Sequence, residues 1–403
     1  MNVSEMDFQE YCCLRRPFMR IDEREDAQWF FGNMQVEARL LDRITSDINL
    51  RGVPKCMVLG RWGIGKTHSL NHLKRLFENN PQEYNVRPLE MQLAPWNDAN
   101  GKNNNWGYIH RKMLDALGEH NLRDMIARFD SLPESRTQKL SVAIEKALKF
   151  GDENLKYSLA VVLANNFLRD QDTTALAWKW LRGEKVDLAA VGANRAIENV
   201  QDMVETIMNI AVLARKALKQ GLVFLIDEAH DLENVKKNKR DIHFGFKTLA
   251  DQANQDLGFV LALFGSGMNV VPSVLTEPGD IIDRLGVTAQ SMHRLVIELK
   301  DVTSDEKDLK LFATKVLENL KDPARAVPLI SDQNLASRTS PELLPFTQDG
   351  IDELVTFLNQ KEETKAPRLI IEHLATIANR AYQEAKRTNA YVLADAAFVH
   401  KVV

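Results

Sequence analysis

A short glycine-rich segment, residues 60–67 with the sequence GRWGIGKT, has the residue spacing of a phosphate-binding loop. Its glycines let backbone N–H groups turn inward around a phosphate, and a helix that begins there adds the positive end of its dipole. We expect Lys66 to reach the β- and γ-phosphate oxygens and the Thr67 hydroxyl to ligate Mg²⁺. The segment predicts a site for ATP and Mg²⁺ formed by Gly60, Arg61, Trp62, Gly63, Ile64, Gly65, Lys66, Thr67 and His68.

A pair of acidic residues follows the apolar run LVFLI at residues 222–226. Asp227 can hold the Mg²⁺ ion through water, and Glu228 can polarise the attacking water as a general base. An apolar strand that ends in two acidic residues is common by itself. Next to a phosphate-binding loop, however, the pair favours hydrolysis of the nucleotide over binding alone.

Other polar residues lie close to these two motifs. Ser266, or else Asn269, follows a second apolar run and can face the γ-phosphate as a sensor. The alternative is a polar turn that contacts neither nucleotide nor water. His68 and His230 have no second ligand at metal-binding spacing, so we interpret both as packing or hydrogen-bonding residues.

Two of the elements that must position these residues, at 221–226 and 257–264, are apolar runs without alternation, which is typical of parallel strands covered on both faces. A helix is predicted over residues 35–48 from its apolar spacing. Strands are predicted at residues 55–60, 86–93, 221–226, 257–264 and 296–299.

The long interval between the second and third strands far exceeds what one crossover helix needs. It is helical in pattern, so we expect a helical insertion at residues 96–220. The chain after residue 303 is also helical, apart from a loop predicted at residues 323–345. We expect an N-terminal leader at 1–29 that docks on something and is not a free domain, a nucleotide-binding core at 30–302 and a helical domain at 303–403.

The composition sets limits on location and partners. The formal net charge of -4 gives no overall attraction to nucleic acid, so such binding requires a local basic patch. The three cysteines form neither a disulfide framework nor a metal site, which indicates a reducing compartment. No apolar run has the length of a signal peptide core or a membrane span, so we expect a cytoplasmic protein.

The two motifs and the segment FFGNMQVE at residues 30–37 resemble AAA+ ATPases of the branch that contains origin-recognition initiators, TnsC-like transposition regulators and STAND-type ATPases. The resemblance implies an α/β fold class, a P-loop NTPase (AAA+) parallel sheet with a large helical insertion and an all-α C-terminal lid. It also implies that Phe31 lies against the adenine. Asn33 replaces the arginine that is usual in this segment.

The resemblance extends to three arginines. Residues 366–370, APRLI, are similar to the lid helix whose arginine reads the γ-phosphate, which implies this role for Arg368. Arg284 and Arg294 lie where the family places the arginine that a neighbouring subunit inserts, which implies an oligomer. Residues 391–395 resemble the end of such lids, so the chain is expected to stop where an initiator's winged helix would begin.

Two further segments concern partners. Residues 178–184, WKWLRGE, resemble an element of origin-recognition-like ATPases in bacterial anti-phage islands, including the ATP-binding components of BREX systems; the alternative is ordinary packing of one helix face. A basic cluster at residues 235–240 can contact DNA phosphates, although such runs are usually solvated loops. Its charged residues are Lys236, Lys237, Lys239 and Arg240.

Two functions remain open at this point. The first is an ATP-driven switch that oligomerises and acts on double-stranded DNA with partner proteins, with a role in genome defence or mobile-element control. The second is a STAND-like, ATP-gated module that regulates an effector protein without nucleic acid. A small-molecule kinase is a weaker third possibility because the sequence shows no acceptor pocket.

Overall fold

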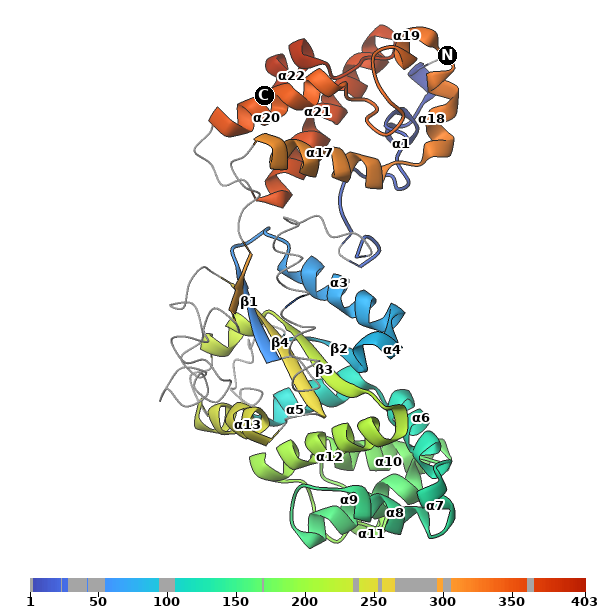
Figure 1. The fold of residues 1–403 in the computed structure, drawn as a ribbon, viewed down its shortest axis with the longest axis vertical. Helices are drawn as coiled ribbons and strands as arrows, with labels where there is room; N and C mark the ends of the chain where they lie inside the picture. The colour runs from blue at the N-terminus through green and yellow to red at the C-terminus, as the bar shows by residue number, and fades with distance from the viewer. Residues whose placement is uncertain are drawn as a thin grey trace. The chain divides into compact units, whose positions relative to one another are not determined.

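The computed structural model describes residues 3–22, 24–27, 42, 55–93, 106–168, 170–234, 239–252, 256–264, 296–299, 306–360 and 366–403 (Figure 1). The chain divides into two compact units. The lid unit contains Met1–Glu37, Arg61–His72 and Leu299–Val403, and the sheet unit contains Ala38–Gly60 and Leu73–Glu298. Nowhere in the described ranges is a helix both long and apolar enough to cross a membrane.

The sheet has the strand order β2-β3-β4-β1-β5, and all of its neighbouring strands are parallel (Figure 1). Each strand matches a predicted strand to within one residue at its C-terminal end, so these predictions are confirmed. In the register, Gly60 lies opposite Phe264 and Asp227 lies opposite Gln92. The strands are β1 (Lys55–Gly60), β2 (Val86–Gln92), β3 (Gly221–Asp227), β4 (Leu257–Phe264) and β5 (Val296–Glu298).

Helices of the sheet unit share one hydrophobic core with the strands. The Trp106 ring packs edge-on against Phe246, with 5.2 Å between the ring centroids, and Phe246 in turn contacts Phe259 of β4. Gly245 makes this approach possible, because a Cβ atom there would lie 2.2 Å from the Trp106 ring. The helices next to the strands in this core are α5 (Trp106–Leu117), α12 (Val200–Leu218), η2 (Ala229–Asn234) and α13 (Lys239–Gln252). Between β1 and β2 the chain forms α3 (Lys66–Asn79) and α4 (Pro81–Tyr84).

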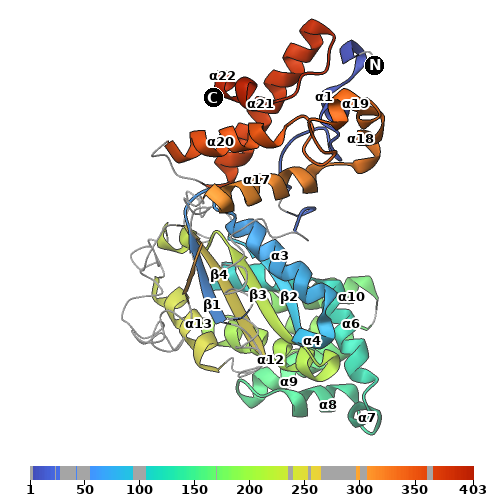
Figure 2. The same ribbon diagram turned by 45° about the horizontal axis from the view of Figure 1, so that its top comes forward.

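The described residues between 106 and 220 form helices and no strand, as predicted for this region (Figure 2). Several of these helices begin at an acidic or amide side chain that accepts a backbone N–H, as Asp152, Asp170 and Asn199 do. Between α5 and α12 lie α6 (Glu119–Asp130), α7 (Pro133–Arg136), α8 (Leu140–Ala147), α9 (Glu153–Asn166), α10 (Gln171–Leu181) and α11 (Leu188–Val191).

The segment at residues 178–184 ends α10 and is held mainly by buried contacts. Trp180 is buried, and its Nε1 donates to the Arg195 carbonyl at 3.0 Å. Arg182 forms an ion pair with Asp115 of α5. The ring of His110 is buried and forms a hydrogen bond with the Leu181 carbonyl, with 2.7 Å between Nε2 and the carbonyl oxygen.

The lid unit is helical. Its core is formed by apolar residues of α17, α20 and α21 together with the N-terminal segment. In chain order its elements are η1 (Val3–Glu5), α1 (Phe8–Tyr11), α17 (Glu306–Leu320), α18 (Pro323–Ile330), α19 (Gln333–Ala336), α20 (Gln348–Gln360), α21 (Pro367–Thr388) and α22 (Ala396–Val402).

The prediction of a loop at residues 323–345 is wrong for the first half of this range, which contains α18 and α19. Proline suggested a loop there, but Pro323 occupies the first turn of α18, where its fixed φ angle suits a helix and its missing N–H is not needed. Asp322 caps this helix, since its side chain accepts the Ala324 N–H. Asp332 caps α19 in the same way.

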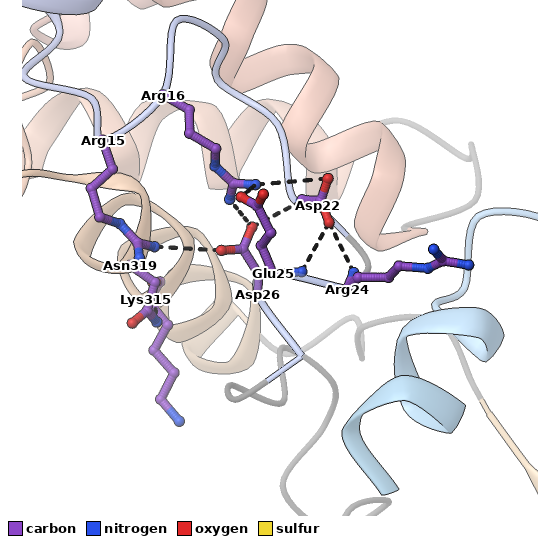
Figure 3. Close-up of polar contacts among 8 residues, drawn as sticks. All are labelled: Arg15, Arg16, Asp22, Arg24, Glu25, Asp26, Lys315 and Asn319. Atoms are coloured by element: carbon purple, nitrogen blue, oxygen red, sulfur yellow. Dashed lines mark hydrogen bonds and ion pairs between the residues drawn. The ribbon is translucent and has the colours of Figure 1, made fainter. Parts of the chain in front are cut away.

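The N-terminal segment docks on the helices of the lid unit. The Arg15 N–H donates to the Leu320 carbonyl at 3.0 Å, and the Tyr11 ring stacks on Tyr391 with 4.5 Å between centroids. Arg15 and Arg16 both pair with Asp26, whose side chain is buried (Figure 3). Two guanidinium groups therefore neutralise one buried carboxylate.

The buried His110 makes stability depend on pH. Burial lowers its pKa from 6.5 to about 4. Between these two pH values the unfolded chain is protonated at this histidine and the folded protein is not. Stability should therefore be lost as the pH falls from 6.5 toward 4, by an amount on the order of 3 kcal/mol. Urea unfolding at pH 7.5, 6 and 5 should show a shallower loss in His110→Gln. Exposed His120 provides the control, His120→Gln, which should keep the wild-type profile; an unchanged His110→Gln profile would contradict the assignment.

Candidate functional site

The phosphate-binding loop connects the end of β1 at Gly60 to the start of α3 at Lys66. Gly63 and Gly65 have φ angles of +74° and +95°, a region that side chains with a Cβ rarely adopt. Lys66 Nζ donates to the Arg61 carbonyl at 3.0 Å, so its ammonium group lies over the loop itself. The glycines thus give the loop the backbone shape that the motif predicts.

Burial differs sharply along the loop. Ile64 and His68 are buried, which ties the loop to the protein, and Thr67 is half-buried. By contrast, Arg61 is exposed and the Trp62 side chain is 68% exposed. A single exposed aromatic residue is common on protein surfaces, so its exposure alone assigns Trp62 no partner.

The acidic pair ends the fully buried strand β3. Asp227 is its last residue, and its Oδ1 accepts the Glu228 N–H at 2.9 Å. Glu228 has a φ angle of +55°, which is uncommon for a residue with a side chain and costs energy. The Glu228 side chain that follows this strained turn is 35% exposed.

His230, which the sequence indicated as a packing or hydrogen-bonding residue, is a neighbour of Glu228. Its Nδ1 lies 3.2 Å from the Glu228 Oε2. The two residues are adjacent because the chain turns into η2 directly after Glu228. The only signal in the sequence was a histidine two residues after the candidate base.

The strand register determines where the motifs lie on the sheet. Because all strands are parallel, Gly60, Asp227 and Phe264 end β1, β3 and β4 at one edge, with β4 between the other two strands. Ligands of open parallel sheets bind outside this carboxyl edge. Residue 61 and Glu228 therefore follow the strands at the functional edge of the fold.

The residues present fit a magnesium–nucleotide complex. At Gly65, no described atom lies within 4 Å of the position that a Cβ would take, so the loop is open where a phosphate would approach. Lys66 is half-buried, and it offers an ammonium group that lies at the loop. Thr67 and Asp227 offer oxygen ligands, which Mg²⁺ prefers. On the loop itself, Lys66 would contact the phosphates and Thr67 the metal ion.

The lid arginine lies beside the loop. Arg368 is the second residue of α21, and its N–H donates to the Gly63 carbonyl at 3.4 Å. Its guanidinium group stacks on the Trp62 ring, 5.2 Å from the centroid, and its Nε lies 2.9 Å from the Glu372 Oε1. Glu372 was not connected with Arg368 from the sequence.

Several predicted site residues lie outside the described residues. The helix predicted over residues 35–48 falls there, apart from the single described residue 42. Lys239 and Arg240, by contrast, are exposed at the start of α13. The predicted site residues that lie outside the described ranges are Phe31, Ser266, Asn269, Arg284, Arg294, Lys236 and Lys237.

The parallel sheet and the glycine loop after its first strand define a P-loop NTPase fold. In agreement with this, residues 50–244 match the model of the KAP family P-loop domain. No curated protein matches the sequence.

Solved structures of similar architecture are distant. The ORC2 protein of Aeropyrum pernix in its ADP form has 13% identity and a TM-score of 0.45, with 91% of this chain and 67% of that chain covered. The RuvB Holliday junction branch migration motor of Thermotoga maritima has 12% identity and a TM-score of 0.35, with 92% and 68% covered. The Aeropyrum pernix ORC1 protein in complex with DNA has 9% identity and a TM-score of 0.39, with 98% and 68% covered. None of these similarities assigns an activity.

The loop geometry gives a direct test at Gly63. Alanine there should weaken nucleotide binding at least tenfold, because its Cβ would lie 3.1 Å from the Arg368 Cβ and the φ angle of +74° is strained by about 1–2 kcal/mol. Titration with a fluorescent ATP analogue measures the effect.

Gly192 is a matched control in the helical region, since it has the same φ angle of +74° and an equally close neighbour, Val161, at 3.1 Å. Gly192→Ala should lower thermal stability yet leave nucleotide affinity unchanged. Equal losses of affinity in both variants would mean that Gly63 matters only for folding.

Proposed function

We propose that this chain is an AAA+ type ATPase that oligomerises and acts on DNA together with partner proteins. The observation that carries the ATPase proposal is the carboxyl edge of the sheet. The glycine loop follows β1 and leads into a helix, and the strained acidic turn follows β3. These two strands are parallel, and β4 lies between them. ATP and Mg²⁺ are the ligands that these residue types suit.

The residues divide the work as follows. Backbone N–H groups of the loop and the Lys66 ammonium bind phosphate oxygens, while Thr67 and Asp227 hold the metal. When bound, Mg²⁺ neutralises charge that develops on the phosphates. Glu228 accepts a proton from the attacking water. The His230 Nδ1 lies 3.2 Å from its carboxylate.

Assembly would complete the site. We propose that Arg284 or Arg294 of one copy approaches the nucleotide of the next copy, as the resemblance implies, and that Ser266 and Phe31 contact the γ-phosphate and the adenine. Association with DNA would use the basic cluster, of which Lys239 and Arg240 are exposed on α13. The resemblance of residues 178–184 to anti-phage ATPases supports a role in genome defence or mobile-element control, in the cytoplasm.

Two substitutions separate binding from hydrolysis. Glu228→Gln should lower the rate of ATP hydrolysis about 100-fold or more, the range for loss of a general base, while ATP still binds. Lys66→Ala should weaken binding itself because a phosphate contact is lost. Phosphate release and ATP titration measure the two effects, and Glu83→Gln, at an exposed position, is the control. Unchanged hydrolysis in Glu228→Gln would remove it from the mechanism.

Assembly and DNA binding are tested with the Glu228→Gln variant, which keeps ATP bound. Light scattering after size exclusion should show a larger species with Mg-ATP and a still larger one with double-stranded DNA. Each phosphate contact contributes about 0.9 to the slope of log affinity against log salt. The double change Lys239→Ala and Arg240→Ala should therefore lower that slope by about 1.8.

The matched control is the double change Lys139→Ala and Lys185→Ala, which removes two exposed lysines of the helical region. It should leave the slope unchanged. A protein that stays monomeric in every state and ignores DNA would overturn the assembly proposal and favour the STAND-like, partner-gating function.

A further inference from the structure

The lid helix α21 uses the phosphate-binding loop to satisfy its own N-terminus. The first N–H groups of a helix lack intrahelical partners, and Pro367 at the first position has none to offer. Ala366, the capping residue, makes no side-chain capping bond. The Arg368 N–H instead donates to the Gly63 carbonyl. The start of the lid helix is therefore attached directly to a loop glycine.

This attachment leaves the Arg368 side chain running along the loop. A Cβ at Gly63 would lie 3.1 Å from the Arg368 Cβ and 3.4 Å from its Cδ. A guanidinium group is a preferred partner of phosphate because it presents several N–H donors in one plane. Arg368 is thus placed where a phosphate bound by the loop would attract it.

Two side chains hold that guanidinium group in the structure. Glu372, one helical turn further along α21, accepts from Nε at 2.9 Å, and the Trp62 ring lies under the charge at 5.2 Å. Arg368 and Glu372 are 59% and 56% exposed. Exposed ion pairs and cation–π contacts are weak, so a multiply charged phosphate can replace them.

We propose that Trp62 and Glu372 are positioning residues that keep Arg368 in a resting place beside the loop, and that the terminal phosphate of a nucleoside triphosphate takes the guanidinium from them. This rests on the proposed function. Under this proposal Glu372 competes with the γ-phosphate for the Arg368 guanidinium. A change at Glu372, which does not bind the nucleotide, would then alter the protein's preference for ATP over ADP.

The competition predicts a selective effect. In the Glu228→Gln background, Glu372→Gln should tighten Mg-ATP binding about two- to fivefold, as expected for release of an exposed ion pair, and leave Mg-ADP binding unchanged. Trp62→Leu should shift the ratio of the two dissociation constants in the same direction. Trp62→Phe keeps an aromatic face and should restore the parent ratio. Isothermal titration calorimetry with each nucleotide measures all four proteins.

The control lies on the same helix, where Glu384 and Arg387 form another exposed ion pair. Glu384→Gln should leave both affinities unchanged. If Glu372→Gln alters ATP and ADP affinity equally, or alters neither, the competition is refuted. If the parent binds neither nucleotide, the proposed function itself fails, and the inference fails with it.

Discussion

Parallel pairing of β1, β4 and β3 is the constraint on which the candidate site depends. Because parallel strands end at one edge, residues far apart in the sequence follow the same edge of the sheet. The register is equally important: a slip of one residue would turn the side chains of β3 to the opposite face, Asp227 included. Every residue of β3 is buried, so both of its faces pack against other parts of the unit.

The helical region extends the core of the sheet and does not form a second one. Apolar residues from α6 to α12 belong to the same buried cluster as those of β2, β3 and β4. Trp106 and Gly245 illustrate the coupling, because the indole ring occupies the space that any side chain at 245 would need. The buried faces of these helices are thus connected to the strands by continuous packing.

The sequence could predict the strands and the phosphate-binding loop because both are local patterns. A buried parallel strand is an unbroken apolar run, and Gly63 and Gly65 are required by the loop's own backbone. Contacts between distant residues left no such pattern. The pairing of Trp62 with Arg368 depends on how α21 packs, and nothing in the spacing of the two residues indicates it.

The error over α18 has a local cause of a different kind. Proline is read as a breaker, yet Pro323 follows a capping aspartate and starts the helix. The sequence predicted that the N-terminal segment docks, but it did not indicate on which element. Arg15 and Arg16 require acidic neighbours, and their positions in the sequence do not identify those neighbours. In the structure their shared carboxylate, Asp26, comes from the same segment.

The lid helix combines strong and weak attachments, and their distribution determines what can move. Along its length α21 is anchored by buried apolar residues, among them Leu374, Ile377 and Ala381, against the rest of the lid core. Its described contacts with the phosphate-binding loop are a long backbone hydrogen bond and an exposed cation–π pair. Burial of several such side chains stabilises the lid far more than exposed contacts can. A ligand at the loop can therefore rearrange the start of the helix without loosening the lid that carries it.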